Sequence, residues 1–521
     1  MIKVRQIKIS ILKDTNEELI NKICKKINIK QEDILEFKIS KKSIDARTKE
    51  DIYYVYEVIL NLKNEDKIKL NNDVITYNEE PYTYTITGSK IMKERPIIIG
   101  SGPAGLFIGY MLSISGFNPI IIERGEQVEN RIKTVDKFFK DGILNKNSNI
   151  QFGEGGAGTF SDGKLNTLVK DKREKKVFEI FVECGAPKEI LYEAKPHIGT
   201  DILRDVIKNM RNKMIECGAT FKYNSTLTNI NIIDNKIKSI IINDKDEIPC
   251  ETLILAIGHS ARDTFKMLYK KGINMISKPF AIGIRIQHPK DLINESMYGK
   301  YGNILPTANY KLTYKAKDNR GVYTFCMCPG GFVVNSSSNE NGLVINGMSN
   351  HKRDEKNSNT ALIVTVDEND YGKALFDGMN FQEKIETKAY EIGKGKIPTQ
   401  NYIDFKNNLQ STKLINEPSF KGNYTLSNIN NILPDYICND LVEAIEYFNN
   451  KIKGYNDDNA IISAPETRTS SPIRIIRDEN YQTNIKGIYP IGEGSGYSGG
   501  ITTSAMDGIR CFEKIISIYK Q

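Results

Sequence analysis

The clearest hydrophobic pattern in the chain lies between residues 95 and 125, where two short apolar runs flank a helical pattern. Residues 97–99 are three isoleucines, which is typical of a strand buried on both faces of a parallel sheet. Residues 106–112 carry apolar side chains with helical periodicity, and residues 120–122 form a second isoleucine run. The pattern therefore predicts a strand, a helix and a second strand parallel to the first.

Glycines with the spacing G-x-G-x-x-G connect the first strand to the helix, and an acid ends the second strand. In a dinucleotide-binding βαβ unit, the first glycine permits the tight turn, the second admits a pyrophosphate and the third packs helix against strand. The helix N-terminus suits phosphate, and the acid can accept hydrogen bonds from both ribose hydroxyls. The predicted cofactor contacts here are Gly100, Gly102, Pro103, Ala104, Gly105, Glu123 and Arg124.

Two kinds of periodicity precede this unit in residues 1–90. Residues 7–11 and 52–62 alternate between apolar and polar positions, as half-buried strands do. Thr15 and Glu18 have capping-box spacing in front of a helical stripe. This predicts a small N-terminal α+β domain, in which we identify no catalytic constellation.

Glycine-rich and apolar segments alternate again between residues 125 and 280. Residues 126–144 read as a helix, residues 149–166 are too rich in glycine for regular structure, and residues 219–242 read as a hairpin. An apolar strand then ends at a glycine after residue 257. The glycine-rich loop is well placed to wrap the remainder of a large cofactor. The predicted contacts from this part are Arg131, Gly156, Gly158 and Gly258.

Aromatic strands and asparagine-rich turns distinguish residues 281–465, which contain no second G-x-G-x-x-G. We interpret them as an inserted substrate domain, with His288 as a candidate proton donor. Cys326 and Cys328 fall on one face of a predicted strand, so a redox pair or an adduct site is conceivable, although small core residues are the favoured interpretation. Residues 466–521 predict a strand into Gly492 and Glu493, then a helix from about residue 501 to 519.

Composition narrows the classes of protein. The 521 residues are 39% hydrophobic and 26% charged, which is ordinary for a globular protein of two or three domains. No apolar run has membrane-spanning length, so a cytoplasmic location is the expectation, and eight scattered cysteines suit a reducing compartment. The net charge is +8, and residues 1–50 hold 13 Lys and Arg against 8 Asp and Glu. We interpret this excess of positive charge as a solvated, lysine-rich face in preference to a nucleic-acid-binding surface.

Six motifs together resemble the flavoproteins of the glutathione-reductase type, and more closely the bacterial FAD-dependent dehydrogenases (NAD(P)/FAD-dependent oxidoreductases) of about this length. The motifs are GSGPAGLFIGY (residues 100–110), QFGEGGAGTFSDGKL (151–165), LAIGHSARDTF (255–265), FAIGIRIQHP (280–289), CMCPGG (326–331) and YPIGEGSGYSGGITTSAMDGI (489–509). The resemblance covers nearly the whole chain. It implies FAD as the cofactor and leaves the substrate open.

Together, the patterns and the resemblance predict an α/β protein: a Rossmann-type FAD-binding domain with an inserted α+β substrate domain and a small N-terminal α+β domain. The expected boundaries are 1–90, 91–280, 281–465 and 466–521. In related flavoproteins an aspartate at the place of Glu493 binds the ribityl chain, and the following glycines leave room for the ring. The resemblance thus adds the contacts Gly492, Glu493, Gly499, Gly500 and Ile501.

The leading functional hypothesis is an FAD-dependent oxidoreductase that transfers a hydride through flavin N5 between a small molecule and NAD(P)H or a protein electron carrier. With no second dinucleotide motif, NAD(P)H would visit only transiently. Two alternatives stay open: a flavin-dependent modifier of RNA or protein that docks through the basic N-terminal domain, and a non-catalytic FAD-binding sensor. The catalytic candidates are His259, His288, Tyr497 and Cys326.

Overall fold

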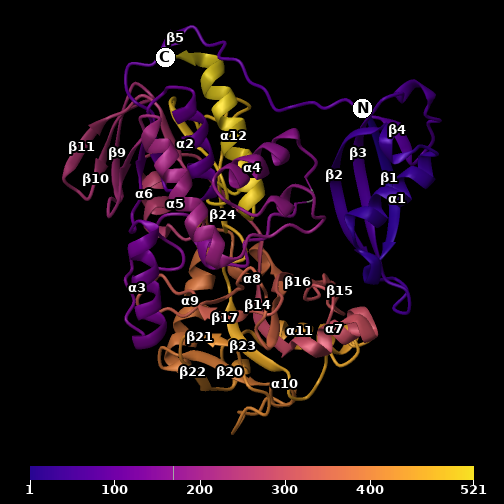
Figure 1. Ribbon diagram of the computed structural model, residues 1–521. Helices are drawn as coiled ribbons and strands as arrows, with labels where there is room; N and C mark the ends of the chain where they lie inside the picture. The colour runs from indigo at the N-terminus through magenta and orange to yellow at the C-terminus, as the bar shows by residue number, and fades with distance from the viewer. Residues whose placement is uncertain (168) are drawn as a thin grey trace.

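A five-stranded parallel sheet carries the G-x-G-x-x-G turn in the computed structural model, which describes residues 1–167 and 169–521 (Figure 1). The strand order is β25-β12-β6-β7-β8, and every neighbouring pair is parallel. The strands are short, and in each one only three residues pair with the neighbouring strands. Their bounds are β6 (Ile97–Ile99), β7 (Ile120–Ile122), β8 (Thr220–Lys222), β12 (Leu253–Leu255) and β25 (Ile488–Pro490).

The two faces of this sheet are buried by different layers. Alternate side chains such as Ile98 and Ile254 pack on the helical layer, whereas Ile97 and Leu253 pack on a second, antiparallel sheet. The helical layer contains α2 (Pro103–Ile114), α4 (Lys172–Glu183), α5 (Thr200–Glu216) and α12 (Ile501–Ile518), and the opposite layer β9 (Leu227–Ile233), β10 (Lys236–Ile242), β11 (Asp246–Pro249) and α6 (Arg262–Lys270). This is the three-layer arrangement that buried β-branched runs require.

The order of the strands places a ligand crevice at one position of the sheet. From β6 the chain crosses over to β7 on one side, and it later returns to β12 on the other side of β6. In open parallel sheets, such a switch point leaves a crevice at the carboxyl ends of the strands. The glycines that follow β6 and β12 lie at this crevice.

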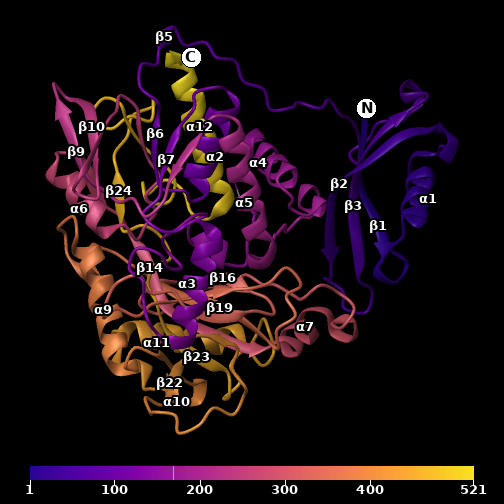
Figure 2. The ribbon, with the colours of Figure 1, turned by 60° about the vertical axis from the view of Figure 1, so that its left-hand side comes forward.

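A larger, mostly antiparallel sheet builds the lower half of the molecule (Figures 1 and 2). Its order is β15-β16-β19-β14-β23-β20-β22, with α9 (Asp377–Gly393), α11 (Asp435–Phe448) and α7 (Lys290–Tyr298) packed around it. Its strands are β14 (Phe280–Pro289), β15 (Thr313–Lys315), β16 (Gly321–Cys328), β19 (Asn357–Val366), β20 (Ile397–Asn401), β22 (Tyr424–Leu426) and β23 (Ile461–Glu466). Beside it, β17 (Phe332–Asn335) pairs with β18 (Ile345–Met348) and β21 (Phe420–Lys421).

Smaller elements connect these two halves. Helix α3 (Val128–Asp141) extends from the upper half down beside the lower one (Figure 2). Strand β13 (Met275–Ser277) pairs with β24 (Ile473–Ile475), and short helices α8 (Glu368–Tyr371) and α10 (Tyr402–Lys406) lie in the lower half. Because the chain leaves the upper half before β14 and re-enters it after β23, two segments cross between the sheets.

The N-terminal segment forms a separate four-stranded sheet with one helix. The sheet contains β1 (Ile2–Ser10), β2 (Ile34–Asp45), β3 (Tyr53–Leu62) and β4 (Val74–Thr76), and α1 (Asn16–Ile27) covers it. A long strap leads from it across the top of the molecule to β5 (Lys90–Ile91), which pairs with the C-terminal β26 (Tyr519–Lys520) (Figure 1). Backbone bonds of Lys42 to Tyr192 and Ala194 join β2 to the main body.

Several elements agree with the hydrophobic pattern. The Thr15 side chain accepts a hydrogen bond from the Glu18 N–H at the start of α1, and Asp234 and Asn235 both have positive φ between β9 and β10. Positive φ at both positions is typical of a type I′ hairpin turn. Helices α4 and α9 lie in segments for which the pattern predicted no helix. Among the described residues, no helix has the length and apolar character that crossing a membrane would need.

Candidate cofactor site

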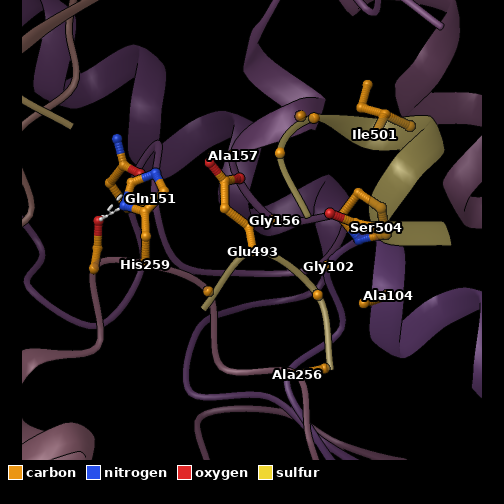
Figure 3. A pocket seen from close by; sticks show the side chains of 18 of the residues that line it. Gly102, Ala104, Gln151, Gly156, Ala157, Ala256, His259, Glu493, Ile501 and Ser504 are labelled. Carbon is orange, nitrogen blue, oxygen red and sulfur yellow. Dashed lines mark hydrogen bonds between the residues drawn. The ribbon is translucent and has the colours of Figure 1, made fainter. Parts of the chain in front are cut away.

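A cavity of about 580 Å³ lies at the carboxyl ends of the parallel strands (Figure 3). Its walls come from the turns after β6 and β12, the end of β7, the glycine-rich loop of residues 151–158 and the first turn of α12. The seven-stranded sheet and the turn after β23 line the other end with Cys326, Glu466 and Arg468. Segments that are hundreds of residues apart in sequence therefore share one cavity.

Glycine backbone forms much of the wall. At Gly258, Gly499 and Gly500, an added Cβ would meet no protein atom within 4 Å, so a side chain there would extend into the cavity. A Cβ added to Gly102 would meet a single protein atom of the described residues within 4 Å, the Cα of Gly156 at 3.7 Å. These positions keep the wall free of side chains, which is what a ligand that lies against the backbone requires.

The other glycines of the turn serve packing. Gly100 has φ +96°, and a Cβ there would lie 2.3 Å from the carbonyl oxygen of Ala256. A Cβ on Gly105 would lie 1.9 Å from the carbonyl oxygen of Gly100, and Gly105 does not line the cavity. Its place in the motif thus corresponds to close packing of α2 on β6, whereas Gly102 faces the ligand space.

Glu123 is buried at the cavity wall and connects its segments. Its Oε2 accepts hydrogen bonds from the Ser101 N–H at 2.9 Å and hydroxyl at 2.8 Å. Its Oε1 accepts from the N–H groups of Gly125 and Gly153 at 2.9 and 3.0 Å. Because two carboxylate oxygens offer about four acceptor sites, a ribose hydroxyl would have to share an oxygen with one of these donors.

Arg131 lies behind the cavity and holds the glycine-rich loop. Its side chain is fully buried, and it donates hydrogen bonds to the backbone carbonyls of Asn149, Ile150, Gly153, Glu154 and Gly156. Burial lowers the pKa of this guanidinium to about 9, while neighbouring acids oppose the shift. The predicted cofactor contact is therefore a support of the loop, not part of the cavity wall.

Glu493 and the half-buried Cys326 lie at the end of the cavity that faces the seven-stranded sheet. Glu493 lines the cavity, and its carboxyl extends toward the position of Ala157 (Figure 3). Burial raises its pKa to about 7, Lys278 opposes the shift, and the nearby Cys326 adds to it. At neutral pH this carboxyl can therefore both give and take a proton.

The backbone at Cys326 has an uncommon conformation. Its φ is +41°, a value rarely found in residues other than glycine, asparagine and aspartate. The register between β16 and β19 shifts between Phe325 and Cys328, so a bulge lies at this point. The bulge turns Cys326 to the cavity, while Cys328 stays fully buried and its sulfur lies 3.9 Å from Nη1 of Arg285.

A buried ion-pair cluster lies beside the cavity at the joint between the two halves. The Glu386 carboxylate of α9 receives hydrogen bonds from Arg468, Arg262 and the Thr467 hydroxyl. Arg468 also donates to the hydroxyl of Ser260, which lies 2.9 Å from Nδ1 of His259 (Figure 3). Since Arg468 and Ser260 line the cavity, this cluster supplies it with fixed polar groups.

His259 lines the cavity, as expected for a catalytic candidate, and its pKa is about 3. Burial is the main cause, and the positive charges of Arg468 and Arg262 add to it. The imidazole is therefore neutral near pH 7. It can accept or donate a hydrogen bond but does not carry a proton to a substrate as an imidazolium.

Two catalytic candidates lie elsewhere. His288 is buried in the core around the seven-stranded sheet. Its Nε2 lies 2.7 Å from the carbonyl oxygen of Tyr455, and the centroids of the two rings are 4.6 Å apart. Tyr497 is 39% exposed, and its ring lies between the guanidinium groups of Arg474 and Arg477. Neither lines the cavity, because one is part of a packed core and the other is held at the surface by two cations.

The remaining predicted cofactor contacts line the cavity, and so do residues that the patterns did not single out. The predicted contacts brought together are Gly100, Gly102, Pro103, Ala104, Glu123, Arg124, Gly156, Gly158, Gly258, Gly492, Glu493, Gly499, Gly500 and Ile501. Lys164, Asn346, Glu466 and Arg468 were missed. Their only sequence signal is polarity inside otherwise apolar strands and loops, which does not distinguish a cavity from an exposed surface.

Comparisons with known proteins give the class. Residues 279–469 match the family model described as "FAD-dependent protein, C-terminal domain-like", and residues 1–61 match a domain of unknown function (DUF8436). The part of the chain that builds the seven-stranded sheet is thus similar to FAD-dependent proteins. An "Uncharacterized protein" of Clostridium beijerinckii is 46% identical over 526 residues, which are 99% of this chain and 98% of that protein. The chain belongs to the same family as that protein.

Solved enzyme structures are similar at low TM-scores. A triple mutant of the flavin-dependent brominase Bmp2 has a TM-score of 0.38 at 12% identity, over 81% of this chain and 80% of that chain. The L-proline dehydrogenase from P. horikoshii has a TM-score of 0.35 at 14% identity, over 82% and 94%. At these values the likeness carries no conclusion on the reaction.

The cavity fits FAD. Its size falls in the usual range for cofactor pockets. Two glycines of the cavity wall, Gly102 and Gly500, are the N-cap residues of α2 and α12. The N–H groups of the first turn of a helix have no partner within the helix, so they can bind phosphate and electron-rich ring atoms. The bare glycine walls described above would take the flat ring. We therefore infer that residues 100–104 hold the pyrophosphate and residues 492–501 hold the flavin end.

The raised pKa of Glu493 predicts a pH-dependent stability difference. The folded pKa of Glu493, about 7, exceeds its unfolded value. The contribution of this carboxyl to the free energy of unfolding is therefore fully present below the unfolded pKa and is lost as the pH rises through 7. Near pH 4.5 the Glu493→Gln variant and the wild type should have the same free energy of unfolding. Near pH 8 the variant should be the more stable by about 2 kcal/mol, after allowance for the partial exposure of the side chain. Urea unfolding at both pH values measures this, with the exposed Glu479→Gln as control. Equal pH profiles for wild type and Glu493→Gln would contradict it.

Proposed function

We propose that the protein is an FAD-dependent oxidoreductase whose small-molecule substrate reaches the flavin from the seven-stranded sheet β15-β16-β19-β14-β23-β20-β22, which we call the substrate sheet. One observation carries the proposal: a single cavity joins the glycine-walled nucleotide end, at β6 and β12, to charged side chains of the substrate sheet. A protein that only stored FAD would not need titratable groups at the ring end. The FAD-dependent family of residues 279–469 supports the same cofactor.

The residues at the ring end have distinct proposed roles. FAD, when bound, supplies two-electron redox chemistry through hydride transfer at N5. Glu493 holds or releases a proton at its carboxyl oxygen near pH 7. Arg468, fixed by Glu386, presents positive charge to an anionic or polar substrate, and neutral His259 offers a hydrogen bond at the same wall.

The electron donor is tested by anaerobic stopped-flow. The purified protein should be yellow, and one of NADH, NADPH or reduced ferredoxin should bleach the flavin absorbance within seconds. Because the chain has one dinucleotide motif, a nicotinamide donor would show weak, saturable binding without a stable complex. Protein without extractable FAD, or flavin that no donor and no small-molecule substrate reduces, would contradict the proposal.

Cofactor binding at the glycine wall is tested by filling it. Gly102→Val and Gly499→Val place a branched side chain in the cavity without a backbone clash, since neither glycine has positive φ and both have open space. Both variants should fold yet lose FAD affinity by about a hundredfold or more, because the steric overlap removes the pyrophosphate or ring contact. Released-flavin fluorescence after gel filtration measures occupancy.

The matched control is Gly342→Val, since Gly342 lies outside this cavity and has ordinary contact distances of 3.6–3.8 Å. It should keep the flavin content of the wild type. Circular dichroism checks that all three variants fold. Full FAD occupancy in Gly102→Val would place the cofactor somewhere other than this cavity.

The docking alternative gains no support from the N-terminal domain. Several of its lysines are paired with acids at 2.7–3.2 Å: Lys3 with Glu57, Lys8 with Asp45, Lys26 with Asp73 and Lys42 with Asp14. Paired lysines present less free positive charge to a phosphate backbone than their number indicates. Absence of RNA retention by the full-length protein at low salt would agree with this reading.

A further inference from the structure

Two cysteines meet at the ring end of the cavity, and the proposed function does not use them. Cys326 lines the cavity, whereas Cys328 is fully buried beneath it. Both thiols are free. The separation of one residue is short, yet the bulge between β16 and β19 takes this segment out of regular strand geometry. The two sulfurs are therefore not held at the fixed spacing of residues i and i+2 of a regular strand.

Backbone strain is confined to the member of the pair that faces the cavity. Cys326 has φ +41°, and its carbonyl oxygen accepts hydrogen bonds from the Arg285 guanidinium at 3.2 Å and from the Cys328 thiol at 3.4 Å. A non-glycine residue in the left-handed region persists only where its surroundings over-determine it, and such residues cluster at functional sites. The chain thus holds Cys326 toward the cavity at an energetic cost.

The surroundings favour a thiolate at Cys326. A hydrogen bond from the Cys328 thiol lowers the pKa of Cys326, and the positive charges of Arg285 and Lys164 add to this against the effect of burial. The pKa of Cys328 is raised, first by the same interaction and then by burial. Lys164 lines the cavity, and its ammonium bonds the carbonyl oxygen of Met327, between the two cysteines. One sulfur is therefore the nucleophile and the other the proton-bearing partner.

We propose that Cys326 and Cys328 form a redox-active pair that cycles between a dithiol and an intramolecular disulfide by exchanging two electrons with the flavin in this cavity. The exchange rests on the proposed function, because the flavin is its electron partner. Both residues line the cavity, Cys326 is close enough to Glu493 for its charge to raise the pKa of Glu493, and Glu493 belongs to the segment proposed to hold the ring. The pair thus lies at the redox end of the site.

The step balances without a further reactant. In one direction the Cys326 thiolate and the Cys328 thiol lose two electrons and one proton, one S–S bond forms, and oxidised FAD takes up the electrons and that proton as the reduced anionic form. In the other direction the S–S bond breaks, Cys326 leaves as thiolate and Cys328 regains the proton. Any external thiol or disulfide that exchanges with the pair reaches Cys326 first, since Cys328 is buried.

The first test counts electrons in the FAD-loaded protein. Anaerobic titration of the air-oxidised wild type with dithionite should consume one two-electron equivalent for the flavin and a second for the disulfide. Cys326→Ser and Cys328→Ser should each consume only the first. The buried, free Cys438 of α11 provides the control, and Cys438→Ser should behave as the wild type. Consumption of a single equivalent by the wild type would overturn the proposal.

The second readout is the mass of the peptide that carries both cysteines, after alkylation under native and reducing conditions. Under native conditions the oxidised protein should yield this peptide without alkyl groups and lighter by two hydrogens than its dithiol form. After photoreduction of the flavin, both cysteines of the peptide should take up an alkyl group. Full alkylation of both cysteines in the oxidised protein overturns the pair, whatever the flavin does. A protein that binds no FAD at all refutes the proposed function and the flavin exchange, while disulfide formation in glutathione buffers still shows whether the pair itself exists.

Discussion

Arg131→Met is expected to reduce FAD retention at least a hundredfold and to lower the free energy of unfolding by about 3–5 kcal/mol. The side chain is fully buried and donates hydrogen bonds to five backbone carbonyls of residues 149–156. Methionine fills similar volume but leaves these carbonyls without their donor. Because Gly156 contacts Gly102 across the cavity wall, relaxation of the loop should open the site where the pyrophosphate is proposed to bind.

Arg204→Met is the matched control for this prediction. The Arg204 guanidinium stacks on the ring of Phe160 at 4.8 Å, the same distance as that of Arg131. Within residues 1–167 and 169–521, its buried Nε has no hydrogen-bond partner. The control therefore removes a cation over the same ring without removing loop contacts. Flavin content by absorbance and unfolding by urea measure both effects, and equal flavin loss in the two variants would show that the loop bonds are not the cause.

The part of the site that follows a strand directly was predictable from the sequence. Gly100, Gly102 and Gly258 follow buried apolar runs, and the carboxyl ends of parallel strands meet at one edge of the sheet. Local pattern is sufficient there, since each glycine is positioned by the strand immediately before it. The glycines before α12 follow the same logic through β25.

Roles that depend on distant partners were not predictable in the same way. Arg131 has the signal of a polar residue on an amphipathic helix, yet its function comes from a loop that begins 18 residues later. Arg468 reaches Ser260, 208 residues away, and Glu386, 82 residues away. His288 shows the converse: a histidine beside a proline in a strand is typical of a site as much as of a core, and only packing against Tyr455 decides between them.

Strand alternation also misleads where a bulge occurs. Regular alternation predicts equal environments for Cys326 and Cys328, but the register shift after Phe325 exposes one to the cavity and buries the other. The resulting asymmetry in pKa follows from Arg285, Lys164 and the contact between the thiols. The hydrophobic pattern of a sequence does not indicate a β-bulge, because a bulge depends on how the strand pairs with its partner strand.

Glu386→Gln should destabilise the protein by about 3–5 kcal/mol at neutral pH, the range found when one partner of a buried ion pair is removed. Arg468 bonds Glu386 at 2.8 and 3.0 Å, and Arg262 bonds it at 3.2 Å. Glutamine keeps the shape but leaves two buried guanidinium groups without a counter-charge. Because Arg262 belongs to α6 of the upper half and Glu386 to α9 of the lower half, the variant should also loosen the joint beside the cavity.

The pH dependence separates loss of charge from loss of shape. Burial by itself would raise the pKa of Glu386, but Arg262 and Arg468 outweigh it and lower the pKa to about 2. The stabilisation is thus complete above the unfolded pKa of the carboxyl and is lost as the pH falls through the folded pKa. Urea unfolding should show the gap between wild type and Glu386→Gln narrowing below about pH 4.5, the region where an unfolded glutamate takes up its proton. Glu383→Gln, an exposed neighbour on α9, should stay within about 0.5 kcal/mol of the wild type throughout. A gap for Glu386→Gln that stays constant down to low pH would assign the destabilisation to packing instead of charge.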